Sequence, residues 1–515
     1  MNAATALLAP SLTAGRGGDP AILFGKRTIT YAELDRESSR FGNAFLAAGL
    51  ERGDRVLLMV GDRPDFLFAY LGAMKAGGVA VGLNVRLAAD DLAFVIDDSG
   101  ARLLVIDEMF LPLYEQAAAR TVNKPLVAVA DRHCAGYRGL QELLVGQPDN
   151  LVAATMDPDD MAFWLYTSGT TGRPKGAVHR HRMVLAADRF LGGVLGVGPG
   201  DRLFCSSKLF FAFALGHCLI GALRLGATVI LYEGWPSPEA IAEVVETHRP
   251  TLLFSVPTFY RNLLRDGIAE SQAFRGVRHF VSAGEKLPES IFERWLMATD
   301  KPIIEGIGAT ETVFLFLANR PHDYRPGSCG RPTPGTEVQL RDEEGRAVNE
   351  TGVPGLLWVR IDSLAARYWQ QPERTEAAFH DGWYCTGDIF VLDEDGVYHH
   401  QGRGDDMLKV SGQWVSPAEI EEQVLRHPGI SDAAVVGVPN ADGLVRLTLF
   451  AVPNDPHADT EALTEDVRQS LMGALSIYKC PRRIVLIDQM PRTATGKIQR
   501  FLLRQMVADQ IGHVG

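Results

Sequence analysis

Short apolar runs alternate with segments of helical spacing through more than half of the chain. Residues 55–60 form an apolar run after Arg55, residues 64–75 place apolar side chains at helical spacing, and residues 79–81 begin another apolar run. Further short apolar runs lie at residues 103–107, 126–130, 228–232, 252–255 and 279–282. Strands that alternate with helices are typical of parallel sheets covered by helices on both faces. The pattern therefore predicts an α/β architecture.

The pattern changes near residue 327, where proline and glycine become frequent. Residues 338–340 and 356–359 are predicted to be strands of a smaller antiparallel unit. A second change follows Gly402, after which the chain carries strand and helix patterns of its own. The predicted strands there are residues 433–438, 447–452 and 484–487. We place a domain boundary between Arg403 and Asp406.

The size and charge of the chain narrow the classes of protein to which it can belong. Its 515 residues, 46% apolar and 22% charged, suggest two to four structural units of roughly 100–200 residues each. The net charge of −12 argues against nucleic acid as the main partner, because phosphate backbones require a basic face. A small anionic ligand stays compatible, since it needs only a local positive site.

Cysteine spacing and hydropathy argue against an extracellular or membrane protein. The six cysteines lie far apart, with no CxxC pair and no His/Cys cluster at zinc spacing, so we expect reduced thiols in a cytoplasmic protein. Residues 1–10 lack the basic region and long apolar region of a signal peptide. The most apolar run, residues 209–223, is shorter than the roughly 20 residues that span a bilayer. We expect this run to be buried core.

Residues 167–176 form a candidate phosphate loop with the sequence Thr-Ser-Gly-Thr-Thr-Gly-Arg-Pro-Lys-Gly, after a predicted strand. Glycines let backbone N–H groups approach phosphate oxygens, hydroxyls add donors, and Lys175 supplies a positive charge. The loop is not a Walker A motif, because Arg173 and Pro174 separate Gly172 from the lysine. An ordinary Thr/Gly-rich surface loop is the alternative, although this string is far more specific. The segment therefore predicts phosphate binding.

Four further motifs follow in order along the chain. They are residues 306–312 (Gly-Ile-Gly-Ala-Thr-Glu-Thr), 383–388 (Trp-Tyr-Cys-Thr-Gly-Asp), 402–412 (Gly-Arg-Gly-Asp-Asp-Met-Leu-Lys-Val-Ser-Gly) and 491–497 (Pro-Arg-Thr-Ala-Thr-Gly-Lys). With the phosphate loop, they resemble the signatures of the adenylate-forming superfamily of acyl-CoA synthetases, peptide-synthetase adenylation domains and luciferases. The resemblance covers nearly the whole chain. It implies that ATP activates a carboxylic acid to an acyl-adenylate, which a thiol then attacks.

The resemblance also implies a fold. We expect an α/β protein whose large N-terminal domain, residues 1–404, holds two parallel α/β subdomains and a small β-barrel-like subdomain. A small mobile α+β C-terminal domain, residues 405–515, would follow a hinge at Asp405. Its rotation would withdraw Lys497 and bring in a loop that forms a tunnel for coenzyme A. The tunnel residues would be Lys409, Ser411, Gly412, Gln413 and Trp414.

Individual motif residues receive roles by the same resemblance. Glu311 would bind Mg²⁺, a hard cation that prefers oxygen ligands, with Thr167 beside the metal and the phosphates. Asp388 would accept hydrogen bonds from the ribose, assisted by Arg403. Lys497 would bridge the acid and the nucleotide in the adenylation transition state. Taken alone, these residues also suit a helix cap, a turn or a solvated surface. The catalytic set would be Lys497, Glu311 and Thr167, and the ATP-binding set Thr167, Ser168, Gly169, Thr170, Thr171, Gly172, Lys175, Gly284, Glu285, Lys286, Glu305, Gly306, Ile307, Gly308, Thr310, Asp388 and Arg403.

Residues 210–217, Phe-Phe-Ala-Phe-Ala-Leu-Gly-His, are expected to line the acid pocket. The segment contains no acidic residue, which argues against an α-amino acid because a buried ammonium needs a paired charge. Its phenylalanines indicate a compact apolar slot, which Phe314 and Phe316 would close. Burial in the ordinary core explains any one of these rings equally well. The predicted acid-binding residues are Ala212, Phe213, His217, Ser282, Ala283, Gly308 and Phe314.

Three segments, residues 210–216, 282–288 and 406–412, resemble the benzoate-CoA ligase branch of the superfamily. The chain differs at Phe213 and Phe314, where a tyrosine and a histidine are expected. This loss of two polar groups argues against unsubstituted benzoate and leaves substituted benzoates, such as amino- or hydroxybenzoate, or a cyclic aliphatic acid as candidates. The predicted reaction converts a benzoate-type acid, ATP and CoA to aryl-CoA, AMP and pyrophosphate.

The sequence is also compatible with other activities. The acid could be a cyclic or medium-chain aliphatic acid, and the acceptor could be the phosphopantetheine of a carrier protein. A non-catalytic nucleotide-binding protein would be expected to lack Glu311 or Lys497, and both are present. We expect the partners to be the acid, ATP, Mg²⁺ and CoA, with no nucleic acid and no membrane. A homodimer is compatible with the sequence.

Overall fold

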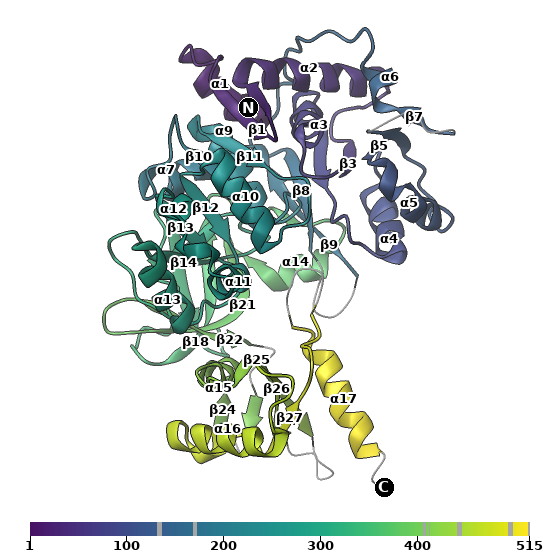
Figure 1. Ribbon diagram of the computed structural model, residues 1–515. Helices are drawn as coiled ribbons and strands as arrows, with labels where there is room; N and C mark the ends of the chain where they lie inside the picture. Colours follow the sequence, from purple (N-terminus) through teal and green to yellow (C-terminus); the bar gives the residue numbers. More distant parts are fainter. Residues whose placement is uncertain are drawn as a thin grey trace. The chain divides into compact units, whose positions relative to one another are not determined.

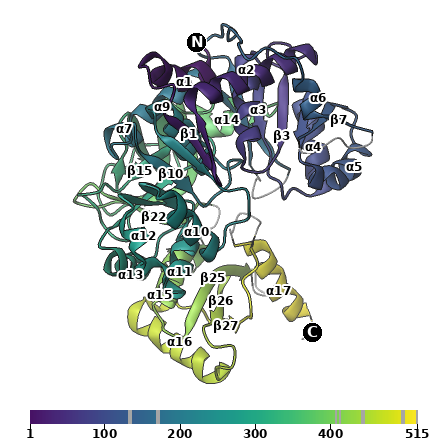
Figure 2. The same cartoon turned by 45° about the horizontal axis from the view of Figure 1, so that its top comes forward.

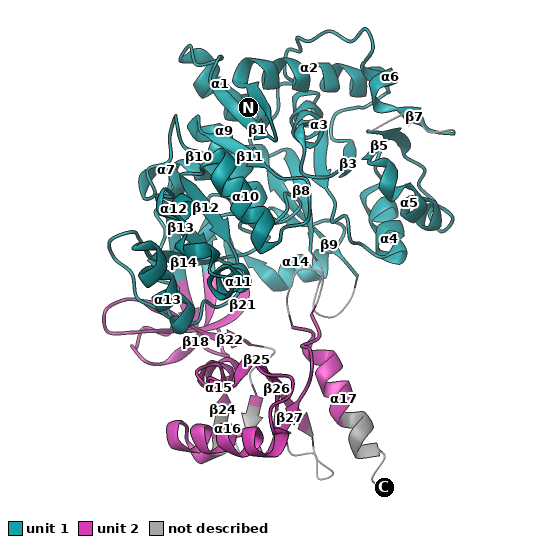
Figure 3. Cartoon of the chain, in the orientation of Figure 1, with its two compact units in different colours: residues 1–338, 359–385 teal, residues 339–358, 386–515 magenta. Residues whose placement is uncertain are grey.

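The computed structural model describes residues 1–130, 136–167, 173–404, 408–410, 413–439, 445–492 and 498–512. The chain divides into two compact units (Figure 3). Unit 1 comprises residues 1–338 and 359–385, and unit 2 comprises residues 339–358 and 386–515.

Unit 1 contains a mostly parallel sheet of eight strands. In order across the sheet these are β19 (Arg367–Tyr368), β9 (Lys175–Arg180), β8 (Met161–Thr167), β4 (Val79–Gly82), β3 (Arg55–Met59), β5 (Leu103–Ile106), β6 (Leu126–Val129) and β7 (Arg138–Gly139). Only β9 and β19 pair antiparallel to their neighbours.

Both faces of this sheet are buried. Val56 and Leu58 of β3 pack into a cluster with α2 (Tyr31–Ala47) and α3 (Pro64–Lys75), which Figure 1 shows beside the sheet. The alternate residues Leu57 and Met59 pack into a second cluster with α4 (Ala89–Ser99) and α5 (Leu111–Ala118). Because successive side chains of a strand point to opposite faces, both sets must be apolar, which explains the continuous apolar runs in the sequence.

A nine-stranded sheet forms the other half of unit 1. In order its strands are β16 (Arg331–Pro332), β15 (Leu315–Ala318), β14 (Ile303–Gly308), β13 (His279–Ser282), β12 (Leu252–Ser255), β10 (Arg202–Cys205), β11 (Thr228–Leu231), β1 (Pro20–Phe24) and β2 (Arg27–Thr30). The strands from β14 to β1 are parallel, and β15, β16 and β2 add antiparallel edges.

The two large sheets share one hydrophobic core. Leu203 and Phe254 belong to the same cluster as Val56 and Leu58 of the eight-stranded sheet. On the opposite face, the nine-stranded sheet packs against α10 (Pro238–His248), α11 (Pro257–Arg265) and α13 (Glu289–Thr299), and Figures 1 and 2 both show α10 and α11 side by side. Other helices of unit 1 are α1 (Ala3–Thr13), α6 (Leu140–Leu144), α7 (Phe190–Gly193), α8 (Ala212–Ala214), α9 (Gly221–Leu225), α12 (Gln272–Arg275) and α14 (Pro372–Ala378).

The predicted motifs begin where strands end. Thr167 ends β8, Ser282 ends β13, and Gly308 ends β14. In open parallel sheets, ligands bind outside the carboxyl ends of the strands. Strands β13 and β14 are parallel neighbours, so their carboxyl ends, and the motifs that follow them, lie at the same edge.

A smaller sheet has five strands. It has β17 (Thr336–Arg341), β18 (Pro354–Ile361), β21 (Trp383–Leu392) and β20 (Phe379–His380) in that order, and β22 (Tyr398–Arg403) also pairs with β21. The rest of unit 2 holds the hairpin β23 (Leu408–Val410) and β24 (Gln413–Val415), the sheet β25 (Ile430–Pro439), β26 (Val445–Pro453) and β27 (Arg483–Leu486), and α15 (Pro417–Leu425), α16 (Thr460–Ala474) and α17 (Arg500–Gly512). Val435 and Leu449 of the sheet pack with Ile420 of α15 and Val467 of α16.

The predicted fold class is confirmed. The helix expected over residues 64–75 is α3, and the apolar runs expected to be strands are β3 to β6 and β11 to β13. The large sheets differ from the prediction in one respect, because each ends in antiparallel strands. The apolar run of residues 209–223 is mostly buried in helical segments. Among the residues that the structure describes, no helix has both the length and the apolar character to cross a membrane.

Candidate active site

An ion pair between a partly buried lysine and a buried glutamate marks the candidate site in unit 1. Lys175 Nζ lies 3.1 Å from Glu311 Oε1. The Tyr368 hydroxyl contacts both partners, because it donates to Glu311 Oε1 over 2.5 Å and accepts from Lys175 Nζ over 2.7 Å. The ammonium also lies 4.0 Å from the centre of the Tyr368 ring, within the range of a cation–π contact. The site thus presents an ammonium and a carboxylate beside the predicted phosphate loop.

Strand pairing positions these three side chains. Lys175 is the first residue of β9, and its partner across the β8–β9 ladder is Thr167. Residues 168–172, which lie outside the described residues, therefore connect two paired strands. Tyr368 lies on β19, which pairs with β9, and Glu311 lies in the turn between β14 and β15. The ends of the phosphate loop are thus fixed by backbone hydrogen bonds.

Glu311 is ionised although its side chain is buried. Burial raises the pKa of this carboxyl, but the Lys175 ammonium and the Tyr368 hydroxyl outweigh that effect, so the pKa lies below its ordinary value. Mg²⁺ is usually held by one or two carboxylates together with phosphate oxygens and waters. A single ionised carboxylate next to a phosphate loop fits this requirement. Among the described residues, no group of three or more His, Cys, Asp or Glu side chains could hold a metal by itself.

His179 supports the turn that carries Glu311. Its ring is fully buried and stacks on Phe163 with 4.9 Å between ring centres. His179 Nε2 lies 3.0 Å from the carbonyl oxygen of Thr310, and because a carbonyl only accepts, Nε2 carries the proton. Burial lowers the pKa of His179 to about 4, so the ring is neutral near pH 7. Thr310, a predicted ATP-binding residue, is thereby held through its backbone.

The predicted nucleotide segment after β13 is held in place by carboxylates. Glu305 is buried on β14, and its Oε1 accepts from the Leu287 amide over 2.9 Å. Glu285 Oε2 accepts from the Thr258 hydroxyl over 3.0 Å. Gly284 has φ 92°, a backbone conformation that glycine adopts without strain. Glu305, predicted to bind ATP, therefore orients the backbone of the segment that contains Gly284 and Glu285.

Three phenylalanine rings surround His217, and we call these four residues the aromatic cluster. The His217 ring centre lies 5.2 Å from that of Phe213, 5.4 Å from Phe314 and 5.6 Å from Phe254. The Phe213 and Phe254 rings also meet edge to face, at 5.8 Å and 72°. His217, Phe254 and Phe314 are buried, and Phe213 is half-buried. The cluster is an apolar aromatic surface with one polar ring.

The two segments that carry the aromatic cluster have unusual backbones. Leu215–Ile220 forms a π-helix between α8 and α9, a feature found often at functional sites. A Cβ on Gly216 would lie 2.6 Å from Val313 Cγ1 and 3.0 Å from Val313 O, so only glycine lets the segments approach this closely. Val313 has φ 59°, a strained value for a β-branched residue. This strained residue lies between Glu311, which belongs to the ion pair, and Phe314, which belongs to the cluster.

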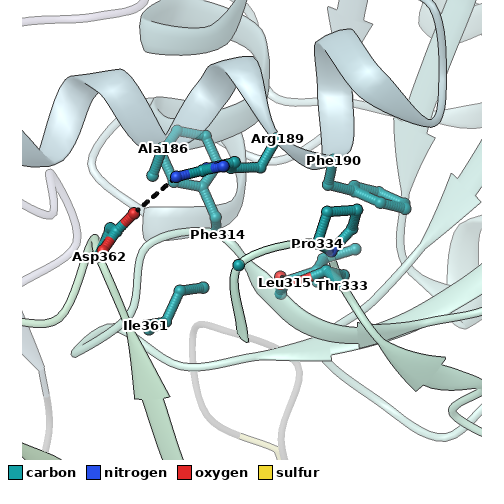
Figure 4. A pocket seen from close by; sticks show the side chains of 10 residues that line it. Ala186, Arg189, Phe190, Phe314, Leu315, Thr333, Pro334, Ile361 and Asp362 are labelled. Atoms are coloured by element: carbon teal, nitrogen blue, oxygen red, sulfur yellow. Dashed lines mark hydrogen bonds and ion pairs between the residues drawn. The ribbon is translucent and has the colours of Figure 1, made fainter. Parts of the chain in front are cut away.

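Phe314 also lines a small cavity in unit 1 (Figure 4). Arg189 and Asp362 form an ion pair of 3.3 Å there. The other lining residues are Ala186, Phe190, Leu315, Thr333, Pro334, Gly335 and Ile361. Phe314 therefore contributes to both the cluster and this cavity. Phe316, which was expected to close the slot with Phe314, is buried on β15.

Asp388 and Arg403 lie together in unit 2. They are cross-strand partners on β21 and β22, and Arg403 Nη1 is 3.4 Å from Asp388 Oδ2. The same Arg403 atom donates to the Thr386 carbonyl over 2.8 Å, and His400 Nε2 lies 3.2 Å from Asp388 Oδ1. The Asp388 side chain is only 12% exposed. The Asp388 carboxylate, predicted to bind the ribose, is thus held in place by the Arg403 guanidinium and the His400 ring.

Other predicted residues lie close to these groups in the sequence. The buried Ser282 hydroxyl has no hydrogen-bond partner among the described residues. The remaining positions are Ala212 at the start of α8, Ala283 and Lys286 after β13, and Gly306, Ile307 and Gly308 on β14. Lys409, Gln413 and Trp414 lie on the β23–β24 hairpin. The predicted residues outside the described part of the chain are Ser168, Gly169, Thr170, Thr171, Gly172, Asp405, Ser411, Gly412 and Lys497.

The sequence did not identify Tyr368, His179 or Phe254 as site residues. Tyr368 lies in no recognised motif, and only the pairing of β19 with β9 brings it to Lys175. His179 lies on β9, three residues after the phosphate loop, but a histidine in a strand gave no separate signal. Phe254 lies in a run that correctly predicted a buried strand, so its ring looked like ordinary core.

Comparison with known proteins finds similarity over nearly the whole chain. The model of the AMP-binding enzyme family matches residues 12–369, and that of the AMP-binding enzyme C-terminal domain matches residues 419–497. The chain is 52% identical both to a 3-hydroxybenzoate–CoA ligase of Aromatoleum sp. (strain CIB) and to a 3-hydroxybenzoate–CoA/4-hydroxybenzoate–CoA ligase of Thauera aromatica, over 98% of this chain and 97% of each relative. The solved structure of the anthranilate CoA ligase AuaEII in complex with anthranoyl-AMP matches with a TM-score of 0.92 and 34% identity, over 98% of this chain and 97% of that one.

Proposed function

Because the chain belongs to the AMP-binding enzyme family, we propose that it activates a hydroxy- or amino-substituted benzoate with ATP and transfers the aroyl group to CoA. In the first step, a carboxylate oxygen of the acid attacks the α-phosphorus of ATP, and pyrophosphate leaves. In the second step, the CoA thiol attacks the aroyl carbonyl carbon, loses its proton, and AMP leaves. The products are aryl-CoA, AMP and pyrophosphate.

The aromatic cluster is the observation that carries the choice of an aromatic acid. Phe213, Phe254 and Phe314 can pack edges and faces against a substrate ring, as aromatic pairs prefer. His217 adds a polar atom to an otherwise apolar surface. The relatives at 52% identity are named for hydroxybenzoates, and the similar solved structure holds anthranoyl-AMP, which supports a ring that bears a polar substituent.

The ion pair supports a role in binding the triphosphate. Lys175 offers a positive charge to phosphate oxygens, and Glu311 offers an ionised carboxylate to Mg²⁺. When bound, Mg²⁺ would offset negative charge on the pyrophosphate leaving group. Tyr368 holds both side chains, so it fixes their orientation before ATP arrives. Thr167, as the strand partner of Lys175, would contribute its hydroxyl beside the phosphates.

The sequence motifs supply the remaining parts of the proposal. Asp388 and Arg403 would bind the ribose, and Lys497 would bridge the acid carboxylate and the nucleotide. A C-terminal domain that begins at residue 405, with its hinge at Asp405, would then rotate so that the β23–β24 hairpin lines the path of CoA. This order suits the chemistry, because the lysine is needed only in the first step and the tunnel only in the second.

A substrate panel tests the proposal. The purified protein is incubated with ATP, MgCl₂, CoA and one of 3-hydroxybenzoate, 4-hydroxybenzoate, 2-aminobenzoate, benzoate, cyclohexanecarboxylate or octanoate, and acyl-CoA and AMP are quantified by mass spectrometry. We expect a substituted benzoate to give the highest kcat/KM. Turnover of octanoate or cyclohexanecarboxylate without turnover of any aryl acid would overturn the aryl assignment. If AMP release requires a carrier protein in place of CoA, the assignment of CoA as the acceptor is wrong.

A further inference from the structure

We propose that His217 selects acids whose ring carries a hydrogen-bond donor, with its Nε2 atom as the acceptor. The inference rests on the proposed function and makes it narrower: phenols and anilines are favoured over rings with fluoro, methoxy or nitro groups at the same position. His217 is thereby a specificity-determining residue of the aromatic cluster.

The hydrogen bond at the other ring nitrogen sets the tautomer of His217. His217 Nδ1 lies 3.0 Å from the carbonyl oxygen of Phe213, one helical turn earlier in the chain. A carbonyl oxygen only accepts, so Nδ1 must carry the proton. In a neutral imidazole with a protonated Nδ1, Nε2 carries a lone pair and only accepts. The backbone of α8 thus fixes the chemical character of the atom on the opposite side of the ring.

The environment keeps His217 neutral. Its side chain is fully buried, and three of its neighbours are the rings of Phe213, Phe254 and Phe314. Burial lowers the pKa of His217 to about 4, so the ring does not become a double donor near pH 7. An acceptor that stays neutral cannot bind a second carboxylate on the acid, which favours a neutral hydroxyl or amine.

Nε2 is also unpartnered. It is a buried polar atom without a hydrogen-bond partner among the described residues. Buried polar atoms are nearly always paired, so an exception calls for an explanation by ligand, water or function. The histidines at positions 179 and 181 likewise have one unpaired ring nitrogen each, but of the three only His217 belongs to the aromatic cluster.

The aromatic cluster adjoins the phosphate-binding side of the site. Gly216, next to His217, lies against Val313, which is two residues after Glu311 in the chain. Phe314 follows Val313 and meets the His217 ring at 5.4 Å. Glu311 and Phe314 of the cluster are thus three residues apart in the chain, which favours a short aromatic acid as the ligand. Its carboxylate would face the nucleotide, and its ring substituent would face Nε2.

The test compares acids that differ only in the donor. Wild type and His217→Phe are assayed with 3-hydroxybenzoate, 3-aminobenzoate, 3-fluorobenzoate, 3-methoxybenzoate and benzoate, and kcat and KM for aryl-CoA formation are measured. We expect wild type to prefer the hydroxyl over the fluoro compound by roughly 10- to 100-fold in kcat/KM, as for one buried hydrogen bond. His217→Phe should lose most of this preference, so that its kcat/KM values for 3-hydroxybenzoate and 3-fluorobenzoate become similar.

A matched variant distinguishes selection of the acid by His217 from a general effect of altered packing in the aromatic cluster. Phe254→Leu removes another ring of the cluster but no acceptor, so it should change kcat/KM for all five acids by a similar factor. If wild type uses aryl acids without regard to the donor, or if His217→Phe keeps the wild-type ratio, the role of His217 is refuted while the proposed function stands. If His217→Phe does not fold, a wild-type ratio of hydroxy to fluoro compound near one still refutes the role of His217. If no aryl acid reacts, the proposed function itself fails.

Discussion

Lys175 and Glu311 form an ion pair of 3.1 Å in which the Tyr368 hydroxyl bonds to both partners. The pair keeps the buried Glu311 carboxylate charged, where an isolated charge would be costly. ATP and Mg²⁺ would offer each partner a new ion: phosphate for the ammonium and the metal for the carboxylate. Both side chains are therefore charged and held by the same hydroxyl before any ligand binds.

Glu311→Gln should slow adenylation. The amide keeps the size of the side chain and removes the negative charge that would hold Mg²⁺, so we expect a loss of about 10²- to 10³-fold. ATP–pyrophosphate exchange, measured with the best aryl acid over a range of Mg²⁺ concentrations, reports this step. Glu337→Gln makes the same chemical change at an exposed residue paired with Arg360 and should leave the exchange rate unchanged. Equal rates for Glu311→Gln and wild type would refute the metal role.

Tyr368→Phe should reduce both stability and affinity for ATP. The variant loses the hydroxyl that bonds Lys175 and Glu311 but keeps the ring beside the ammonium. We expect a loss of about 1–2 kcal/mol in unfolding free energy and roughly a tenfold lower kcat/KM for ATP. Tyr260→Phe is a matched control, since its hydroxyl donates to the Leu253 and Val281 carbonyls in the core.

The control should share the stability loss without the kinetic effect. Urea unfolding and initial rates at varied ATP concentration measure the two quantities separately. If the variants at Tyr368 and Tyr260 have the same kcat/KM for ATP, Tyr368 is structural only.

Lys497→Ala should separate the two half-reactions. If Lys497 bridges the acid and the nucleotide, adenylation should fall by at least about 10²-fold, because a charge that offsets the transition state is lost. Thioester formation from a chemically prepared aryl-AMP and CoA should stay within a few-fold of wild type. ATP–pyrophosphate exchange and aryl-CoA formation from the adenylate measure the two steps. Equal loss in both would contradict the assignment and indicate a general structural defect.

Local sequence patterns predicted the helices and strands, whereas the pairing of distant strands determined which site residues meet. The helix α3 and strand β12 match the predicted bounds because apolar spacing depends on neighbouring residues only. Glu311 and Lys175 were recognised because each lies in a contiguous motif. Tyr368 could not be recognised, since it meets Lys175 only through the pairing of β19 with β9, almost 200 residues apart in the chain.

The residues of the aromatic cluster could likewise be predicted only in part from the sequence. Phe213 and His217 share one helical turn, so a single segment suggested both. Phe254 joins them from the parallel strand β12, where its apolar character was already explained by burial in the sheet. The strained φ of Val313 also has no signal in the sequence, because a valine is disfavoured in that conformation. Val313 packs closely against Gly216, a contact between segments far apart in the chain.

The buried imidazole of His217 should contribute to the acid sensitivity of the fold, and substitution of His217 should remove that contribution. Burial lowers its folded pKa to about 4 from an ordinary 6.5, so between these values the unfolded chain binds a proton that the folded chain does not. Folding stability therefore falls as the pH drops below 6.5, by roughly 2 kcal/mol at pH 5 for this residue. In His217→Phe this contribution is absent, so its stability should decline less between pH 7.5 and pH 5. The urea midpoint is measured at each pH in place of an extrapolated free energy of unfolding. A chain of two compact units need not unfold in one step, and such a free energy assumes that it does. Phe254→Leu, which removes no titrating group, should give a curve parallel to wild type. A His217→Phe curve that is also parallel to wild type would show that His217 is not held neutral by burial.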